Sequence, residues 1–143
     1  MRILNNYHSV KEIIEKQHIK LVDFKIVDLI GRWRHVTIPA SRFTPNLAEI
    51  GLGFDGSNYD YRPVQKSDML FIPDITTAKV EQFPGERAIT MTGDIYEVGE
   101  EGETKSFSQD PRGTAKRAVE YLNKVGIADH CYLSPEFEFY IFD

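Results

Sequence analysis

The chain has 143 residues, 41% of them hydrophobic and 27% charged, a composition typical of a folded protein of one or two small domains. Its net charge is −5 and its basic residues form no long run, which excludes the basic face that duplex nucleic acid requires. A single cysteine excludes a disulfide framework, and without a signal peptide or a long apolar run we expect a cytoplasmic protein and no membrane partner.

The first forty residues predict one short helix followed by a β-hairpin. Ser9, with Glu12 three residues later, has the pattern of a capping box, and apolar residues at helical spacing then predict a helix over 10–18. Residues 21–31 predict a strand that ends near a glycine, and residues 33–39 predict a second strand that a proline stops. The short break between them indicates a tight turn.

The middle of the chain alternates between turn-rich and apolar segments. Residues 43–64 are rich in glycine and proline and predict a long irregular loop. Residues 68–74 and 87–98 each predict a strand. Residues 97–106 are polar and contain glycine, which favours a linker.

A helix and a final strand are expected after this linker. Ser108 or Asp110 can cap a helix that carries Pro111 in its first turn and stops near Gly126. Residues 132–143 alternate between polar and apolar side chains, which predicts a strand. The whole pattern indicates an α+β fold.

Glu136 and Glu138 are the strongest candidates for metal ligands. Alternation along a strand places both on one face, with carboxylates roughly 7 Å apart. This spacing suits two neighbouring hard cations such as Mg²⁺ or Mn²⁺. The alternative is a half-buried strand whose glutamates face water.

A second candidate site is the turn that contains Asp55 and Ser57 between glycines, where oxygen atoms and backbone N–H groups can face a ligand. The alternative is an ordinary Asx turn. Asp68 can assist Asp55, or it can simply cap the start of the next strand. Trp33 is expected on one face of an amphipathic hairpin rather than in a phosphate-binding patch, and Cys131 is expected to be buried.

Read in order, five segments of the chain resemble glutamine synthetase type I. They are DFKIVDLIGRWRHVTIP, GLGFDGSNY, KSDMLFIPD, DPRGTAKRAVEYLNKVGIAD and LSPEFEFYIFD. Their order and spacing match the family from about residue 19 to the end of the chain. The series FDGS, SDM, DPR and PE-x-EF is far more specific than any one of its parts.

The resemblance implies a β-grasp domain over 1–103 and the beginning of the funnel-shaped catalytic domain over 104–143. It implies ATP-dependent ligation of ammonia to glutamate through γ-glutamyl phosphate, with two or more Mg²⁺ or Mn²⁺ ions. Glu136 and Glu138 match metal ligands, Asp55 matches the carboxylate that attracts and deprotonates ammonium, and Ser57 and Asp68 match the ammonium loop and its neighbour.

The resemblance also implies a homo-oligomeric ring, a dodecamer, in which Asp55 serves the active site of the neighbouring subunit, apart from the Glu136 and Glu138 of its own chain. The other ligands of the family's site have no counterpart in these 143 residues, so we expect the chain alone to be inactive. Residues 58–63 depart from the family pattern. A γ-glutamyl ligase for an organic amine and a non-catalytic β-grasp interaction module remain as alternatives.

Overall fold

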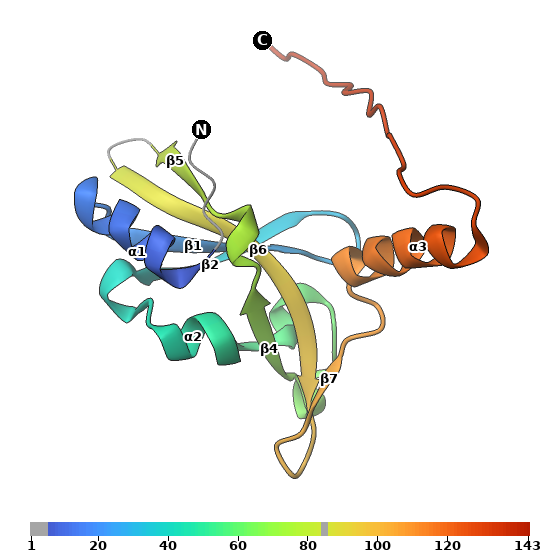
Figure 1. Cartoon of the computed structure of the whole chain (residues 1–143), viewed down its shortest axis with the longest axis horizontal. Helices are drawn as coiled ribbons and strands as arrows, with labels where there is room; N and C mark the ends of the chain where they lie inside the picture. Colours follow the sequence, from blue (N-terminus) through green and yellow to red (C-terminus); the bar gives the residue numbers. More distant parts are fainter. Residues whose placement is uncertain (1–5, 84–85) are drawn as a thin grey trace.

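The structure is a computed structural model that describes residues 6–83 and 86–143 (Figure 1). Seven strands of this described part form one mixed sheet in the order β2-β1-β6-β4-β3, with β5 and β7 also paired to β6. The α+β class is confirmed. The helices are α1 (Tyr7–Lys16), α2 (Pro45–Ile50) and α3 (Pro111–Val125), and the strands are β1 (Leu21–Val27), β2 (Trp33–Pro39), β3 (Leu52–Asp55), β4 (Asp68–Pro73), β5 (Lys79–Phe83), β6 (Glu86–Val98) and β7 (Thr104–Ser106).

Strand β6 organises the sheet because it pairs with four other strands. Its first half runs parallel to β1 and antiparallel to β5, and its second half pairs antiparallel with β4 and β7. Gly93 lies where the partners change, and a Cβ there would approach the Ile72 carbonyl oxygen to 2.3 Å. Only glycine therefore fits at this crossing without a shift of β4.

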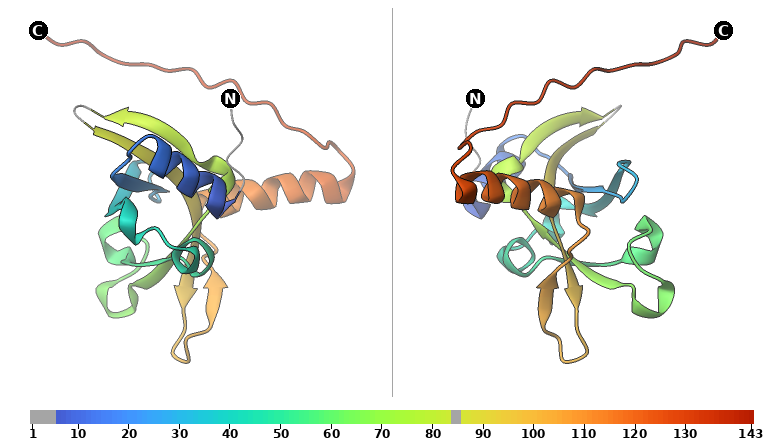
Figure 2. Two further views of the ribbon diagram at one scale, coloured as in Figure 1. Left: turned by 60° about the vertical axis from the view of Figure 1, so that its left-hand side comes forward. Right: turned by 90° about the vertical axis from the view of Figure 1, so that its right-hand side faces the viewer.

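Helix α1 lies against the sheet (Figure 2), and its buried residues belong to one hydrophobic core with residues of the strands. Val10 and Ile14 repeat at helical spacing on α1 and are buried. Phe24 on β1 and Phe71 on β4 are almost fully buried, and their ring centroids lie 5.2 Å apart. The alternation of β1 and β4 thus directs apolar side chains to one common interior.

The first helix begins earlier than its sequence pattern predicts. Asn6 is the N-cap and accepts a hydrogen bond from the Ser9 backbone, while the Ser9 hydroxyl returns to Asn6. The prediction that Ser9 caps the helix is wrong, because asparagine is an equally good cap. The Tyr7 ring packs on Phe43 at 5.4 Å, which gives the added turn a tertiary contact.

Two segments expected to be irregular contain regular structure. Residues 43–64 include α2, capped by Thr44, and β3. Residues 97–106 are the end of β6, a turn and β7, so the expected linker is a β-hairpin. Its polar composition reflects the exposure of β7, whose three residues all face solvent. β7 pairs within the sheet, and the domain division at 103/104 stays a prediction.

The end of the chain differs most from expectation. The helix α3 is confirmed, with Asp110 as its cap and Gly126 at its C-terminus. The strand expected over 132–143 is wrong: these residues have no regular structure, and they extend away from the sheet (Figure 1). A strand needs a hydrogen-bonding neighbour, and no described strand pairs with this segment. Cys131 is exposed rather than buried.

We expect the 143-residue chain to self-associate through residues 132–143. Phe137, Phe139 and Ile141 alternate along this segment and are 87%, 78% and 85% exposed. Apolar strand-like segments without a partner favour edge-to-edge pairing. Light scattering should show a mass that rises with concentration. A variant with all three residues changed to serine should stay monomeric, and a monomeric wild-type chain at high concentration would refute the expectation.

Candidate functional site

The antiparallel pairing of β3 and β4 brings two of the expected site residues together. Asp55 ends β3, Asp68 begins β4, and the two are direct cross-strand partners. Directly opposed residues have Cβ atoms about 4.5–5.5 Å apart on one face of a sheet. Both side chains are exposed. The register therefore places two acidic side chains on one face of the sheet, an arrangement that suits a cation bound between them.

The turn after β3 holds the Asp55 carboxylate in one orientation. Its Oδ1 accepts hydrogen bonds from the Ser57 hydroxyl at 2.6 Å and from the Ser57 backbone N–H at 2.9 Å. These two bonds lower the pKa of Asp55 below its ordinary value, and a hydrogen bond from the Ser67 side chain makes a smaller contribution. Both bonds from Ser57 are made to the same oxygen, Oδ1, so the turn fixes the carboxylate through one of its two oxygens. Asp55 is therefore a carboxylate that stays anionic at neutral pH.

Replacing Ser57 with alanine should raise the pKa of Asp55. The substitution removes the hydroxyl, the largest cause of the lowered value, and keeps the backbone bond. Because the pKa is lowered only in the folded state, the stability that Ser57 contributes through the Asp55 anion is fully present above the ordinary aspartate pKa and is lost as the pH falls through the lowered value. A carboxyl NMR titration should show the upward shift, and an unchanged Asp55 titration would contradict the role given to Ser57.

Asp68 lines a polar groove of about 780 Å³, which lies between residues 62–69 and the hairpin of β6 and β7. Its walls include Lys66 and Glu100, together with an ion pair between Arg62 and Glu97. No other described residue makes a side-chain hydrogen bond or ion pair with Asp68. The groove thus gives a small polar ligand a route to a free carboxylate.

Glu136 and Glu138 are not brought to this aspartate pair. Both are exposed and lie in the segment that extends away from β4 (Figure 1). No group of three or more acidic, histidine or cysteine side chains suited to a metal ion occurs within residues 6–83 and 86–143. The two glutamates supply the oxygen ligands that Mg²⁺ and Mn²⁺ prefer, but two carboxylates are fewer than these ions require. Their role as metal ligands stays a prediction.

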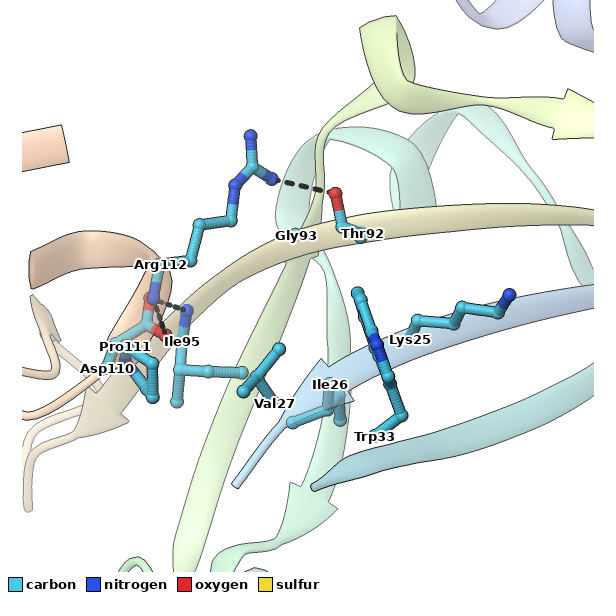
Figure 3. Close-up of a pocket in the computed structure, with 10 residues that line it drawn as sticks. All are labelled: Lys25, Ile26, Val27, Trp33, Thr92, Gly93, Ile95, Asp110, Pro111 and Arg112. Atoms are coloured by element: carbon cyan, nitrogen blue, oxygen red, sulfur yellow. Dashed lines mark hydrogen bonds between the residues drawn. The ribbon is translucent and has the colours of Figure 1, made fainter. Parts of the chain in front are cut away.

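A separate cavity of about 360 Å³ lies between the β1–β2 hairpin, β6 and the start of α3 (Figure 3). The Trp33 side chain, 63% exposed, stands beside Lys25 and Val27. Lys25 is engaged by Glu81 at 2.6 Å, and Arg112 turns toward Thr92. Because neither cation is free, the cavity offers apolar surface rather than a phosphate site. Trp33 belongs to the exposed face of β2, as expected.

The contacts that join the sheet to α3 were not predicted from the sequence. Asp110 is buried, and its carboxylate accepts hydrogen bonds from backbone N–H groups at the start of α3 and from the Ile95 N–H of β6. Burial raises the pKa of Asp110 despite these bonds. Arg112 pairs with Asp74 and donates to Thr92. The sequence DPR was the signal for this junction, because it places a helix cap and a cation on either side of a proline. The residues that Asp110 and Arg112 contact in the sheet and before it lie 15 to 38 residues away in the chain, so the sequence did not identify them.

Two family models together match most of the chain. Residues 18–98 match the model described as glutamine synthetase, beta-Grasp domain, and residues 108–143 match glutamine synthetase, catalytic domain. In the described part, no helix has the length and apolar character needed to cross a membrane.

Curated relatives include glutamine synthetases and a mutase. A glutamine synthetase of Aquifex aeolicus is 38% identical over 138 residues, and one of Escherichia coli K12 is 36% identical over 135 residues. A 3-hydroxylaminophenol mutase of Cupriavidus pinatubonensis is 37% identical over 136 residues. Each match covers 94% of this chain but 28% of the relative. The chain therefore spans little more than a quarter of the length of these proteins.

Solved structures support the same fold. A Plasmodium falciparum glutamine synthetase superposes with a TM-score of 0.73 at 23% identity, covering 87% of this chain and 24% of that one. GmaS without ligand superposes with a TM-score of 0.67 at 22% identity, covering 81% of this chain and 26% of that one. At these identities the likeness concerns the fold alone.

Proposed function

This chain belongs to the glutamine synthetase family, and on that premise we propose that the whole protein is a glutamate–ammonia ligase. It joins ammonia to the γ-carboxylate of glutamate at the expense of ATP. The chain contributes the ammonium side of that site and lacks a complete catalytic centre of its own. The proposal includes a cytoplasmic homo-oligomeric ring, a dodecamer, with active sites between subunits.

The observation that carries the proposal is the opposed pair Asp55 and Asp68. An ammonium ion is small, so it is held best by a compact anionic site, and two carboxylates on adjacent strands supply one. The hydrogen bonds from Ser57 keep Asp55 anionic, because they stabilise its charged form. A larger organic amine would also need apolar space next to the charge, and both aspartates are exposed.

The reaction requires ammonia to arrive uncharged at an activated carboxyl group. The γ-carboxylate of glutamate attacks the γ-phosphorus of ATP, forming γ-glutamyl phosphate and releasing ADP. Ammonium bound at Asp55 and Asp68 gives up a proton to a carboxylate as its nitrogen approaches the acyl phosphate. The nitrogen then forms the amide bond and phosphate leaves. Asp55 thus both concentrates the cation and orients it.

We assign Glu136 and Glu138 to the divalent cations of the same reaction. Bound Mg²⁺ or Mn²⁺ would neutralise charge on the transferring phosphoryl group. The exposed, unpaired state of both glutamates in the described chain is compatible with this role, and water and phosphate oxygens would supply further ligands.

The mutase relative supports a second candidate, because at 37% identity it is as similar as the ligases. Purified full-length protein should be assayed with ATP, glutamate and ammonium, with methylamine in place of ammonium, and with 3-hydroxylaminophenol alone. We expect glutamine and phosphate only with ammonium. Turnover only with methylamine would indicate an amine ligase, conversion of 3-hydroxylaminophenol would indicate the mutase, and no turnover would favour the interaction module.

A further inference from the structure

The turn that follows Asp55 is enclosed by aromatic side chains. Residues Gly56–Tyr59 form a short 3₁₀ turn directly after the carboxylate. The Tyr59 ring lies edge-on to Phe54 at 5.1 Å and stacks with Tyr61 at 6.0 Å. Tyr61 also contacts Phe54 at 6.3 Å. Asp55 is therefore flanked on both sides by residues whose rings pack on one another.

Tyr61 connects this turn to the rest of the molecule. Its side chain is 3% exposed, and its hydroxyl donates a hydrogen bond to the Val27 carbonyl oxygen at the end of β1. Its own backbone N–H donates to the Gly56 carbonyl oxygen at 3.1 Å, which closes the turn. Burial raises the pKa of Tyr61, so the hydroxyl keeps its proton and remains a donor.

A second anchor joins the turn to the segment before α3. The Tyr61 ring lies 5.2 Å from Phe107, which is fully buried and held by a backbone bond to Ile95. The Arg62 guanidinium lies 5.1 Å from the centre of the Phe107 ring and pairs with Glu97. The position of the turn is thus determined by β1 on one side and by the chain leading into α3 on the other.

We propose that Tyr61 is a positioning residue for ammonium binding: its hydroxyl and ring hold the turn so that the Asp55 carboxylate faces Asp68 across the two strands. The inference rests on the ligase function proposed above for the ammonium step. Tyr61 lies in residues 58–63, the stretch that was expected from the resemblance to differ from the family pattern. The contacts that anchor the turn are thus made by a residue of this stretch.

Tyr61→Phe is the decisive variant because it keeps the ring and removes only the hydrogen bond to Val27. Tyr7→Phe is a matched control, since the Tyr7 hydroxyl also donates to a backbone carbonyl, that of Phe43 at 3.3 Å, away from Asp55. In the full-length enzyme we expect Tyr61→Phe to raise the KM for ammonium about threefold to tenfold, which is the range that one hydrogen bond supports. The KM values for glutamate and ATP should stay unchanged, as should all values for Tyr7→Phe.

Two results would overturn the proposal: an unchanged KM for ammonium in Tyr61→Phe, or an equal rise in the KM values of all three substrates. A second measurement separates this inference from the ligase proposal. In the 143-residue chain, carboxyl NMR should show an upward shift of the Asp55 pKa in Tyr61→Phe and none in Tyr7→Phe, because a loosened turn weakens the bonds from Ser57. If the full-length protein is not a ligase, this shift still tests the positioning of Asp55, and its absence refutes it.

Discussion

Replacing Asp55 with asparagine should lower kcat/KM for ammonium about 10²- to 10⁴-fold in the full-length protein, the range typical for loss of a positioned acid–base group. Asparagine has nearly the same shape and can still accept from Ser57, so the change removes the charge and leaves the turn in place. Steady-state kinetics with ammonium as the varied substrate measures the effect. The KM values for ATP and glutamate should change little, because the proposed role of Asp55 is to bind and deprotonate ammonium.

The matched control is Asp60→Asn, five residues further along the same loop. Asp60 is exposed and pairs with Arg32 at 3.2 Å, a surface ion pair with little energetic weight. Its left-handed backbone conformation, with φ of 61°, suits asparagine as well as aspartate. Asp60→Asn should keep the wild-type kcat/KM. A wild-type value in Asp55→Asn, or an equal loss in Asp60→Asn, would remove Asp55 from the ammonium site.

Replacing Phe71 with alanine should lower the free energy of unfolding by about 3–5 kcal/mol, as large-to-small changes of buried phenylalanine do. The Phe71 side chain is 1% exposed and packs on Phe24 from the neighbouring part of the sheet. It also lies beside Gly93, where a Cβ would come within 2.5 Å of its ring. The cavity would therefore form at the crossing of β4 and β6, three residues from Asp68.

Urea unfolding followed by circular dichroism measures this loss on the 143-residue chain at low concentration. Val64→Ala is the control, because Val64 is 71% exposed and its truncation should change stability by no more than about 0.5 kcal/mol. A loss below about 1 kcal/mol in Phe71→Ala would mean that the β4–β6 crossing repacks. In that case the position of Asp68 would not depend on this contact.

Local sequence patterns were sufficient to predict a helix or strand whose own residues determine its structure. β1, β2, β4 and β6 follow from alternating apolar residues, and α3 follows from Asp110, Pro111 and Gly126 at its ends. The five candidate site residues came from the sequence as well, but their roles depended on the resemblance of the motif series to a family. The cross-strand pairing of Asp55 with Asp68 could not be predicted from the sequence, because register is a property of two strands together.

The sequence by itself determined the fold class and the resemblance to a family, because apolar periodicity, caps and motif order are local properties of the chain. Only the tertiary structure decided which residues meet. It paired β7 with β6 where a linker was expected, left 132–143 without a strand partner, and joined Tyr61 to Val27 across 34 residues. The physical reason is that a strand, a cap and a buried hydroxyl each need a partner, and the partner is supplied by residues distant in the chain.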